Sequence, residues 1–416
     1  MHILFLSDNF PPEVNAPASR TFEHCREWVK AGNQVTVITC APNFPRGKVF
    51  EGYRNRLWQS EQIEGIRVIR VWSYIASNEG FAKRILDYVS YMVSAFLAAF
   101  FVRKIDVIVG TSPQFFTACA AYAISLVKRR PWVFELRDIW PESIRAVGAM
   151  KEGPLLALLE RLELFLYRRA TAIVSVTHAF KQDLIDRGVG GDKIYVVTNG
   201  VDTTRFSPAG KDEQLERELG LQGKFVAGYI GTHGMAHGLD TLIDAAILMQ
   251  NSGAADHLQI LMLGDGAHRA MLESRAQQAR LRNIVFLDSV SKDRVTRYWS
   301  LLDVSIIHLK KSSLFKTVVP SKLFECMGMA IPVIHGVEGE SAEMVLHHEI
   351  GVTFEPENPK DLVQCLHRLH DERELRARLS RNGPLAAAHF DRSLLARRML
   401  TVLEKYAPGS ADRAGD

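Results

Sequence analysis

The chain has 416 residues, of which 47% are apolar and 24% are charged, and its formal net charge is +4. This length predicts two or three domains, each large enough to bury a core. The composition excludes a disulfide-stapled peptide, a collagen-like or disordered chain and a highly charged nucleic-acid tail, so no nucleic-acid partner is expected. Residues 1–200 hold 25 Lys and Arg against 19 Asp and Glu, and residues 201–416 hold 26 against 28. The mildly basic front half favours anionic partners such as phosphates or a membrane surface.

Short runs rich in Val, Ile and Phe recur along the chain and predict strands. In the first half they lie at residues 2–7, 34–40, 66–72, 106–111, 132–137, 172–177 and 194–198. In the second half they lie at residues 225–230, 258–263, 284–287, 304–309 and 332–335. Continuous apolar runs are typical of strands that are covered on both faces, as in a parallel sheet.

The segments between these runs have helical periodicity. Ala18, Phe22, Cys25 and Val29 share one face of a predicted helix, and Gly32 follows where a helix ends. Alternating strands and helices predict an α/β fold with two doubly wound domains that face a central cleft. The expected division is residues 1–205, residues 206–390, and a C-terminal segment, 391–416, with a helix that crosses back and a disordered tail.

The cysteines lie far apart and show neither C-x-x-C spacing nor metal-site pairing with histidine. They are therefore expected to be reduced core residues of a cytosolic protein. They are Cys25, Cys40, Cys119, Cys326 and Cys365. The first strand-like run begins directly after Met1, which argues against a cleaved signal peptide.

Residues 85–102 are apolar except for Asp87, Ser90 and Ser94, which form one narrow polar stripe on a predicted helix. Eighteen residues would extend about 27 Å, just short of a bilayer core. Three interpretations stay open: a membrane span, a helix that dips into the membrane surface beside the basic residues that flank it, or an ordinary buried helix.

Two loops that follow predicted strands are suited to an anion. Residues 7–18 place small residues before a helix, where free N–H groups can bind phosphate, although a simple proline-containing loop explains them equally well. Residues 231–238 contain three glycines and two histidines, a pattern that fits an oxyanion cradle. No G-x-G-x-x-G occurs there, and Gly264-Asp265-Gly266 lacks the third glycine, so a nicotinamide dinucleotide site is poorly supported.

A third candidate lies at residues 315–325. Ser321 follows Pro320 as an expected helix N-cap, and Lys322 and Glu325 lie one turn apart. A lysine at a helix N-terminus is unfavourable unless an anion also binds there, and a nearby carboxylate could accept hydrogen bonds from a ribose diol. The alternative is a surface ion pair that contributes little.

Two further strand ends stay ambiguous. Residues 199–202 form either a plain turn or a hinge loop beside the cleft. Residues 135–142 contain either a structural ion pair or part of a site.

Taken together, these segments resemble the family 4 glycosyltransferases of GT-B fold, from about residue 2 to residue 405. The most specific matches are Ser-Asp-x-x-Pro-Pro-Glu at residues 7–13, Thr-Asn-Gly-Val-Asp at 198–202 and Pro-Ser-Lys at 320–322. Within this family, Glu-x-Arg-Asp-x-Trp-Pro-Glu at 135–142 and Gly-Thr-His-Gly at 231–234 resemble enzymes of O-antigen and capsule assembly. These include enzymes proposed to transfer N-acetyl-L-fucosamine from a UDP donor.

The resemblance implies that the second half binds the nucleotide sugar and the first half binds the acceptor. Glu325 matches the last glutamate of the E-x₇-E motif and would hold the ribose. Arg137, Asp138 and Lys322 are the expected catalytic residues. The expected substrate-binding residues are Asn15, Ala16, Asn199, Gly231, Thr232, His233, His237, Gly264, Asp288, Ser289, Val290, Lys316, Ser321 and Glu325.

The sequence departs from the family pattern at three places. Thr317 occupies the position of the first glutamate of E-x₇-E, so its usual contact with the donor sugar is absent. The Arg and Lys that commonly neutralise the diphosphate fall near His233 and His237, which leaves that charge to Lys322 and Lys316. Arg137 takes the position of a histidine on the acceptor side.

The resemblance implies transfer with retention of configuration, by a front-face displacement in which the leaving phosphate takes the acceptor proton. Neither a metal ion nor a cofactor is expected, because no Asp-x-Asp motif occurs. The expected acceptor is a saccharide on a polyprenyl diphosphate at the inner face of the plasma membrane, contacted through residues 85–102. The alternatives are a GDP-sugar-dependent transferase, a UDP-N-acetylhexosamine 2-epimerase, a nicotinamide dehydrogenase and a catalytically silent scaffold.

Overall fold

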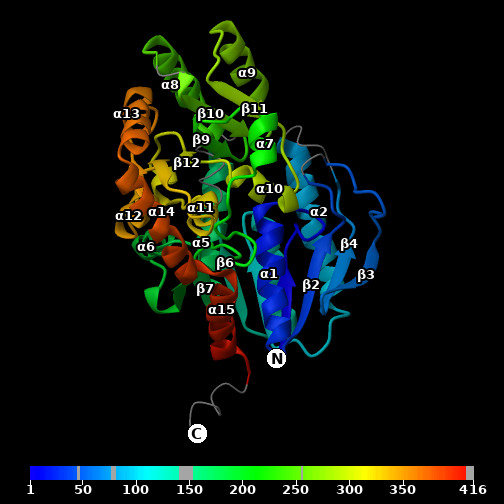
Figure 1. Cartoon of the computed structure of the whole chain (residues 1–416). Coiled ribbons are helices and arrows are strands. Elements are labelled where there is room, and N and C mark those ends of the chain that lie inside the picture. Colours follow the sequence, from blue (N-terminus) through cyan, green and yellow to red (C-terminus); the bar gives the residue numbers. More distant parts are fainter. Residues whose placement is uncertain (45–46, 76–80, 140–152, 254–255, 409–416) are drawn as a thin grey trace. The chain divides into compact units, whose positions relative to one another are not determined.

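The computed structural model describes residues 1–44, 47–75, 81–139, 153–253 and 256–408 (Figure 1). The chain divides into two units, each with its own sheet and core. Unit 1 consists of Met1–Thr198 and Arg392–Asp416, and unit 2 consists of Asn199–Asp391.

The sheet of unit 1 has eight strands in the order β3-β4-β2-β1-β5-β6-β7-β8. Neighbouring strands are parallel except for the edge pair β3 and β4. At the centre, Ile3 of β1 lies opposite Val35 on one side and Val107 on the other. The strands are β1 (His2–Leu6), β2 (Gln34–Cys40), β3 (Trp58–Ile63), β4 (Ile66–Val71), β5 (Val107–Thr111), β6 (Trp132–Leu136), β7 (Ala172–Ser175) and β8 (Ile194–Val196).

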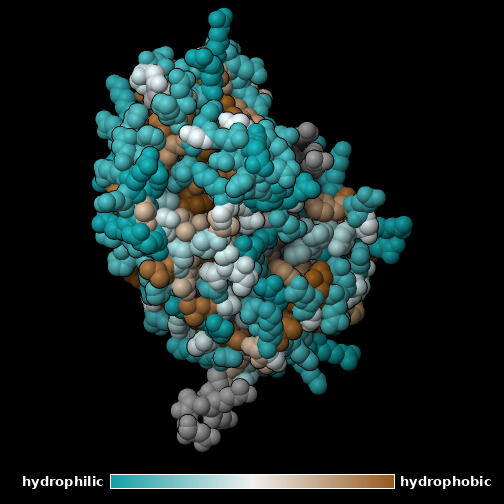
Figure 2. All heavy atoms as spheres, viewed as in Figure 1, coloured by the Kyte–Doolittle hydropathy of each residue, from teal (hydrophilic) through white to brown (hydrophobic). Residues whose placement is uncertain are grey.

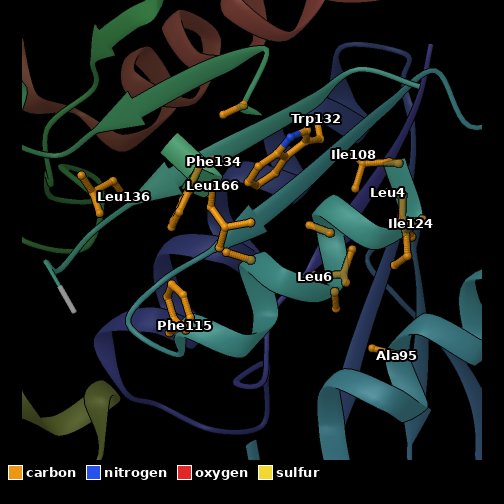
Figure 3. Packing of buried hydrophobic residues seen from close by; sticks show 14 of the residues in the cluster. Leu4, Leu6, Ala95, Ile108, Phe115, Ile124, Trp132, Phe134, Leu136 and Leu166 are labelled. Atoms are coloured by element: carbon orange, nitrogen blue, oxygen red, sulfur yellow. The ribbon is translucent and has the colours of Figure 1, made fainter. Parts of the chain in front are cut away.

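Helices cover both faces of this sheet, which explains its continuous apolar strands. One face carries α2 (Phe81–Ala99), α3 (Phe115–Lys128), α5 (Pro154–Arg169) and α6 (His178–Asp186). Figure 3 shows the core beneath them, where Trp132 and Phe134 of β6 lie near Leu166. The other face carries α1 (Ala16–Lys30) and α15 (Arg392–Tyr406), which lie side by side (Figure 1). The indole N–H of Trp28 donates to the Ala396 carbonyl at 2.8 Å, so the end of the chain completes unit 1.

The sheet of unit 2 has six parallel strands in the order β11-β10-β9-β12-β13-β14. They are β9 (Phe225–Ile230), β10 (Leu258–Leu263), β11 (Ile284–Leu287), β12 (Val304–His308), β13 (Val333–Gly336) and β14 (Gly351–Thr353). The helices are α7 (Glu213–Glu218), α8 (Asp240–Asn251), α9 (Arg269–Gln278), α10 (Lys292–Trp299), α11 (Lys322–Gly328), α12 (Glu340–His347), α13 (Pro359–Asp371) and α14 (Arg373–Ala387). Hydrophilic side chains cover most of α8 and α9 on the face in Figure 2, as expected for helices whose apolar side is turned to the sheet.

The two ends of unit 2 are paired with each other. Val201 forms a parallel bridge with Asp391, and the Val201 N–H donates to the Phe390 carbonyl at 3.0 Å. The Thr203 hydroxyl donates to the Asp391 carboxylate at 2.6 Å. The chain therefore enters and leaves unit 2 at one place.

The predicted fold class is confirmed, because every predicted strand is present within two residues at either end. The edge strands β3 and β14 were not predicted. The cysteines are free, as expected, and Cys119 is the one that is only half-buried. Residues 85–102 are helical as far as Ala99, and no helix in the described ranges is long and apolar enough to cross a bilayer. Most of the tail expected to be disordered, residues 409–416, lies outside the described residues.

Candidate functional site

The carboxyl ends of the strands in unit 2 bring several predicted residues to one edge of the sheet. The loop 231–238 follows β9, the loop 264–268 follows β10, and α11 starts at Lys322. In parallel α/β sheets this edge is where ligands bind.

Close backbone packing holds the two glycine-containing loops together. The His233 N–H donates to the Asp265 carbonyl, and the His268 N–H donates to the His233 carbonyl, both at 2.9 Å. A Cβ atom on Gly264, whose φ is +150°, would lie 1.8 Å from the Gly231 carbonyl oxygen. Only glycine allows this approach, so residue 264 has a definite structural role in the site.

Lys322 places its ammonium beneath the first of these loops. The Nζ atom is buried, lies 3.7 Å from the centroid of the Tyr229 ring, and has no hydrogen-bond partner among the described residues. A Cβ atom on Gly231 would lie 2.8 Å from this Nζ. Burial lowers the pKa of Lys322 to about 8. A buried cation without a hydrogen-bond partner is costly, and an anionic ligand would reduce that cost.

His233 and His237 contact the same tyrosine. Their ring centroids lie 5.8 and 6.2 Å from that of Tyr229. Within the described chain, both ring nitrogens of His233 and Nδ1 of His237 are buried without a hydrogen-bond partner. Burial, reinforced by the charges of Arg269 and Lys322 at His233 and of Lys322 at His237, lowers the pKa of each ring to about 4. Both imidazoles are therefore neutral at pH 7.

Two further buried histidines, His308 and His335, were not predicted, and His308 contacts the loop that carries His237. The Glu357 N–H donates to His308 Nε2 at 2.9 Å, so Nδ1 carries the proton and donates to the His237 carbonyl at 2.7 Å. His335 is fully buried and lies 2.7 Å from the Ser341 hydroxyl through Nε2. His308 is the last residue of β12 and His335 the last but one of β13, and a histidine near the end of an apolar strand is the only signal that could have indicated them.

The remaining predicted residues of unit 2 occupy different settings. Lys316 is half-exposed and pairs with Glu338 at 3.4 Å. Asp288 is exposed after β11 and pairs with Arg269 at 2.8 Å, with Ser289 and Val290 following it. The Thr232 carbonyl accepts the Tyr229 hydroxyl at 2.8 Å. Glu325 lies on α11 with Lys322.

Ser321 occupies the N-cap position of α11, as predicted, but its side chain makes no capping hydrogen bond. Its helical backbone angles (φ −61°, ψ −27°) explain this, because a capping side chain needs an extended backbone. Asn199 opens unit 2, two residues before the bridge at Val201.

In unit 1, the predicted residues lie after β6 and before α1. The Ser112 hydroxyl accepts the N–H groups of Arg137 and Asp138 at 2.7 and 3.1 Å. Burial lowers the pKa of Arg137 to about 10. Asn15 is the N-cap of α1, where its side chain accepts the Ala18 N–H at 2.9 Å, and Ala16 is the first helical residue. Residues 140–142 of the predicted segment 135–142 lie outside the described residues.

A buried network beneath these residues was not among the predicted site residues. Arg20 pairs with Glu135 at 2.9 Å and also donates to the carbonyls of Thr198 and Val197 at 2.7 and 2.9 Å. Burial alone would raise the pKa of Glu135, but the charges of Arg20 and Arg137 hold it near 2. This network joins α1 and β6 to the last residues before unit 2.

The described residues contain no group of three or more side chains that could hold a metal ion.

Two Rossmann-like units in one chain define the GT-B class, and solved structures of that class match this chain. The sucrose-phosphate synthase of Thermosynechococcus elongatus has a TM-score of 0.77 at 15% identity, covering 97% of this chain and 98% of that chain. Anabaena HepE in complex with UDP and glucose has a TM-score of 0.73 at 18% identity, covering 96% and 98%.

The sequence identifies the family. Residues 18–205 match the model of Glycosyltransferase Family 4, and residues 211–385 match that of Glycosyl transferases group 1. The two matches together span most of the chain, and the chain therefore belongs to the family 4 glycosyltransferases. It is similar to WcaI of Escherichia coli (strain K12), which is named as a glycosyl transferase of colanic acid biosynthesis. The two are 26% identical over 376 residues, which cover 87% of this chain and 90% of WcaI.

Proposed function

We propose that this glycosyltransferase moves a sugar from a UDP-sugar to a saccharide on a polyprenyl diphosphate during assembly of a surface polysaccharide. The observation that carries the proposal is the buried ammonium of Lys322, which lies over the Tyr229 ring and has no hydrogen-bond partner among the described residues. Beside it lie buried ring nitrogens without a hydrogen-bond partner, both of His233 and Nδ1 of His237. This arrangement suits a diphosphate, because the side chains of Lys322 and the two histidines offer hydrogen-bond donors and a positive charge, and none of these three is a carboxylate. The similarity to WcaI supports a polysaccharide product, and the complex of HepE with UDP and glucose supports a uridine donor.

Unit 2 binds the donor in this proposal. Lys322 stabilises the negative charge that develops on the departing diphosphate, and Gly231 and Gly264 let the backbone approach it closely. Glu325 accepts hydrogen bonds from the ribose hydroxyls, and residues 288–290 lie beside the base. Lys316, Ser321, Thr232 and Asn199 complete the donor contacts.

Unit 1 binds the acceptor. Arg137 and Asp138 orient the acceptor hydroxyl, and Asn15 and Ala16 complete the substrate contacts of this unit. Holding the hydroxyl near the anomeric carbon supplies much of the rate enhancement, because positioning replaces a bimolecular encounter. The leaving phosphate takes the acceptor proton, and the configuration is retained. Charge is supplied by side chains rather than by a metal ion, and the donor sugar is an N-acetylated amino sugar such as N-acetyl-L-fucosamine.

The outer surface of α2 supports contact with the inner face of the plasma membrane. Leu86, Val93 and Leu97 are exposed on this helix. Its polar stripe instead faces the protein: the Ser90 hydroxyl accepts the Tyr74 N–H and donates to the Asp87 carbonyl, both at 2.7 Å. An apolar face turned outward and flanked by Lys and Arg suits an interfacial helix.

Co-sedimentation with vesicles of phosphatidylethanolamine and phosphatidylglycerol tests this surface. We expect Leu97→Ser to reduce the bound fraction several-fold, because burial of one leucine side chain contributes about 1.5–3 kcal/mol. Leu346→Ser is the matched control, since the two leucines are 55% and 58% exposed. Equal binding of both variants and the parent would contradict the membrane contact.

Calorimetric titration with UDP, GDP, ADP and NAD⁺, with and without EDTA, tests the donor. We expect selective binding of UDP that survives EDTA. We also expect Lys322→Met to weaken binding at least tenfold, whereas Lys316→Met has a smaller effect because its ammonium already pairs with Glu338. Preference for GDP would change the donor class, and binding of NAD⁺ alone would refute the proposal. Sugar released without an acceptor would favour the epimerase.

A further inference from the structure

The charge available for an anion in unit 2 is incomplete at neutral pH. Lys322 supplies one positive charge, and its ammonium has no hydrogen-bond partner among the described residues. His233 and His237 are neutral in the empty site, because burial and the neighbouring cations lower the pKa of each to about 4. A diphosphate linked at both ends carries two negative charges. The charge of Lys316 is already compensated by Glu338, so one charge of the diphosphate has no counter-charge.

The groups that face each histidine decide which ring can become charged. His237 faces Lys322 from α11, His308 from β12, His233 from its own loop, Tyr229 from β9 and the Gly234 carbonyl. None of these groups is an anion.

His233 is 0% exposed and faces Arg269 as well as Lys322. Asp265 and Glu273 act on it in the opposite sense, but Arg269 already pairs with Glu273 at 2.8 Å. His237 is half-buried whereas His233 is fully buried, so solvent reaches His237 more readily and can deliver a proton to it.

We propose that the nucleotide diphosphate enters this site together with one proton from solvent, which the neutral ring of His237 takes up. The ring nitrogen that carries the lone pair forms the new N–H bond, and no bond of the nucleotide breaks. The resulting imidazolium and the Lys322 ammonium then match the two charges of the diphosphate. The inference rests on the proposed donor site and adds the protonation state in which that site binds.

Coupling between the proton and the nucleotide is reciprocal. A ligand that favours the protonated ring binds less tightly as the pH rises, by about tenfold per pH unit for each proton taken up. At pH 7, Lys322 is already mostly protonated, because its pKa is about 8. Proton uptake at this pH therefore reports the imidazole, and uptake above pH 8 includes the lysine.

The experiment is a calorimetric titration of the full chain with UDP at pH 7, repeated in buffers of different ionisation enthalpy. The dependence of the measured heat on the buffer gives the number of protons taken up. His237→Lys carries a permanent charge, His237→Gln carries none, and His257→Gln changes an exposed histidine as the control. Comparing variants at one pH cancels the contribution of the terminal phosphate of UDP itself.

We expect a wild-type uptake that exceeds that of His237→Lys by close to one proton, and an unchanged uptake in His257→Gln. We also expect the affinity of His237→Lys to change less than threefold between pH 6 and 7, where both lysines stay charged, and His237→Gln to bind at least tenfold more weakly. Circular dichroism establishes that the variants are folded. Tight binding with equal uptake in the parent and in His237→Lys overturns this inference and leaves the donor site intact. Failure of UDP to bind the parent overturns both.

Discussion

Single residues set the shape of the candidate site in unit 2, and glycines do so as much as charged groups. Gly264 touches the Gly231 carbonyl so closely that a Cβ atom would overlap it at 1.8 Å. The loop that covers Lys322 depends on this contact.

We expect Gly264→Ala to lower the free energy of unfolding of unit 2 by on the order of 3 kcal/mol, because a methyl group adds both a clash and a strained φ. Gly210→Ala is the matched control, since nothing lies within 4 Å of its Cβ position. Urea titration of the two variants measures the difference, and equal stability would refute the packing.

Buried histidines also make stability depend on pH. Burial, together with the nearby His308, lowers the pKa of His335 to about 3 from 6.5. Below pH 6.5 the unfolded chain binds a proton that the folded chain does not. The contribution of the buried, neutral His335 ring to stability is therefore complete above pH 6.5 and is lost as the pH falls towards 3.

Each such histidine makes the free energy of unfolding fall more steeply with decreasing pH, by about 1.4 kcal/mol per pH unit. Between pH 6 and 4.5, we expect His335→Gln to reduce the slope of the unfolding free energy against pH by the equivalent of one proton. The exposed His257→Gln should leave this slope unchanged. Urea titrations at several pH values provide the test, and a slope that is the same in the parent and in His335→Gln would contradict the burial of a neutral imidazole.

At the scale of elements, one guanidinium joins three segments of unit 1. Arg20 on α1 pairs with Glu135 at the end of β6 and donates to the two carbonyls that follow β8. Removing one partner of a buried ion pair leaves the other charge uncompensated.

We expect Arg20→Met to destabilise unit 1 by about 3–5 kcal/mol, and Arg20→Met with Glu135→Gln to recover part of that loss. Arg26→Met on the same helix should change stability little, because its contacts with Glu27 and Glu64 are 3.6 and 3.9 Å long. Thermal unfolding distinguishes these cases. No recovery in the double variant would assign the loss to the contacts of Arg20 with the carbonyls.

Most of the strands that the sequence predicts are buried on both faces, although the edge strand β11 is half-buried throughout. Their apolar runs are continuous, and β2, β9, β10 and β11 have the predicted bounds. β3 was missed because its residues alternate between exposed and half-buried. β14 was missed because its three residues, Gly-Val-Thr, include one large apolar side chain, whereas the equally short β8 reads Ile-Tyr-Val. Lys322 was predictable from its place at a helix start. The contacts of His308 and Arg20 join residues far apart in the chain, so no local pattern indicates them.

At the scale of the whole molecule, the last helix belongs to the first unit. Leu395, Ala396, Met399 and Leu403 of α15 are buried in the core that α1 covers. Unit 2 is one continuous segment, Asn199–Asp391.

We therefore expect the fragment 199–391 to fold and bind UDP by itself, and the fragment 1–391 to lose the cooperative unfolding of unit 1. Within the full chain, Leu403→Asn should destabilise unit 1 by about 2–5 kcal/mol, while the exposed Thr401→Asn should have little effect. Differential scanning calorimetry resolves the two units. An unchanged transition of unit 1 in Leu403→Asn would contradict this role of α15.

The return of the chain to unit 1 sets an order of events during synthesis. Domains usually fold in the order in which they leave the ribosome. Here the first 198 residues emerge early but wait for α15, whereas unit 2 is complete as soon as Asp391 has left the exit tunnel. Unit 2, which emerges second, can therefore complete its fold before unit 1. Until α15 has emerged, nascent unit 1 presents the apolar surface that Trp28 and its neighbours later share with this helix, and a chaperone that shields it would act only on chains that still lack α15.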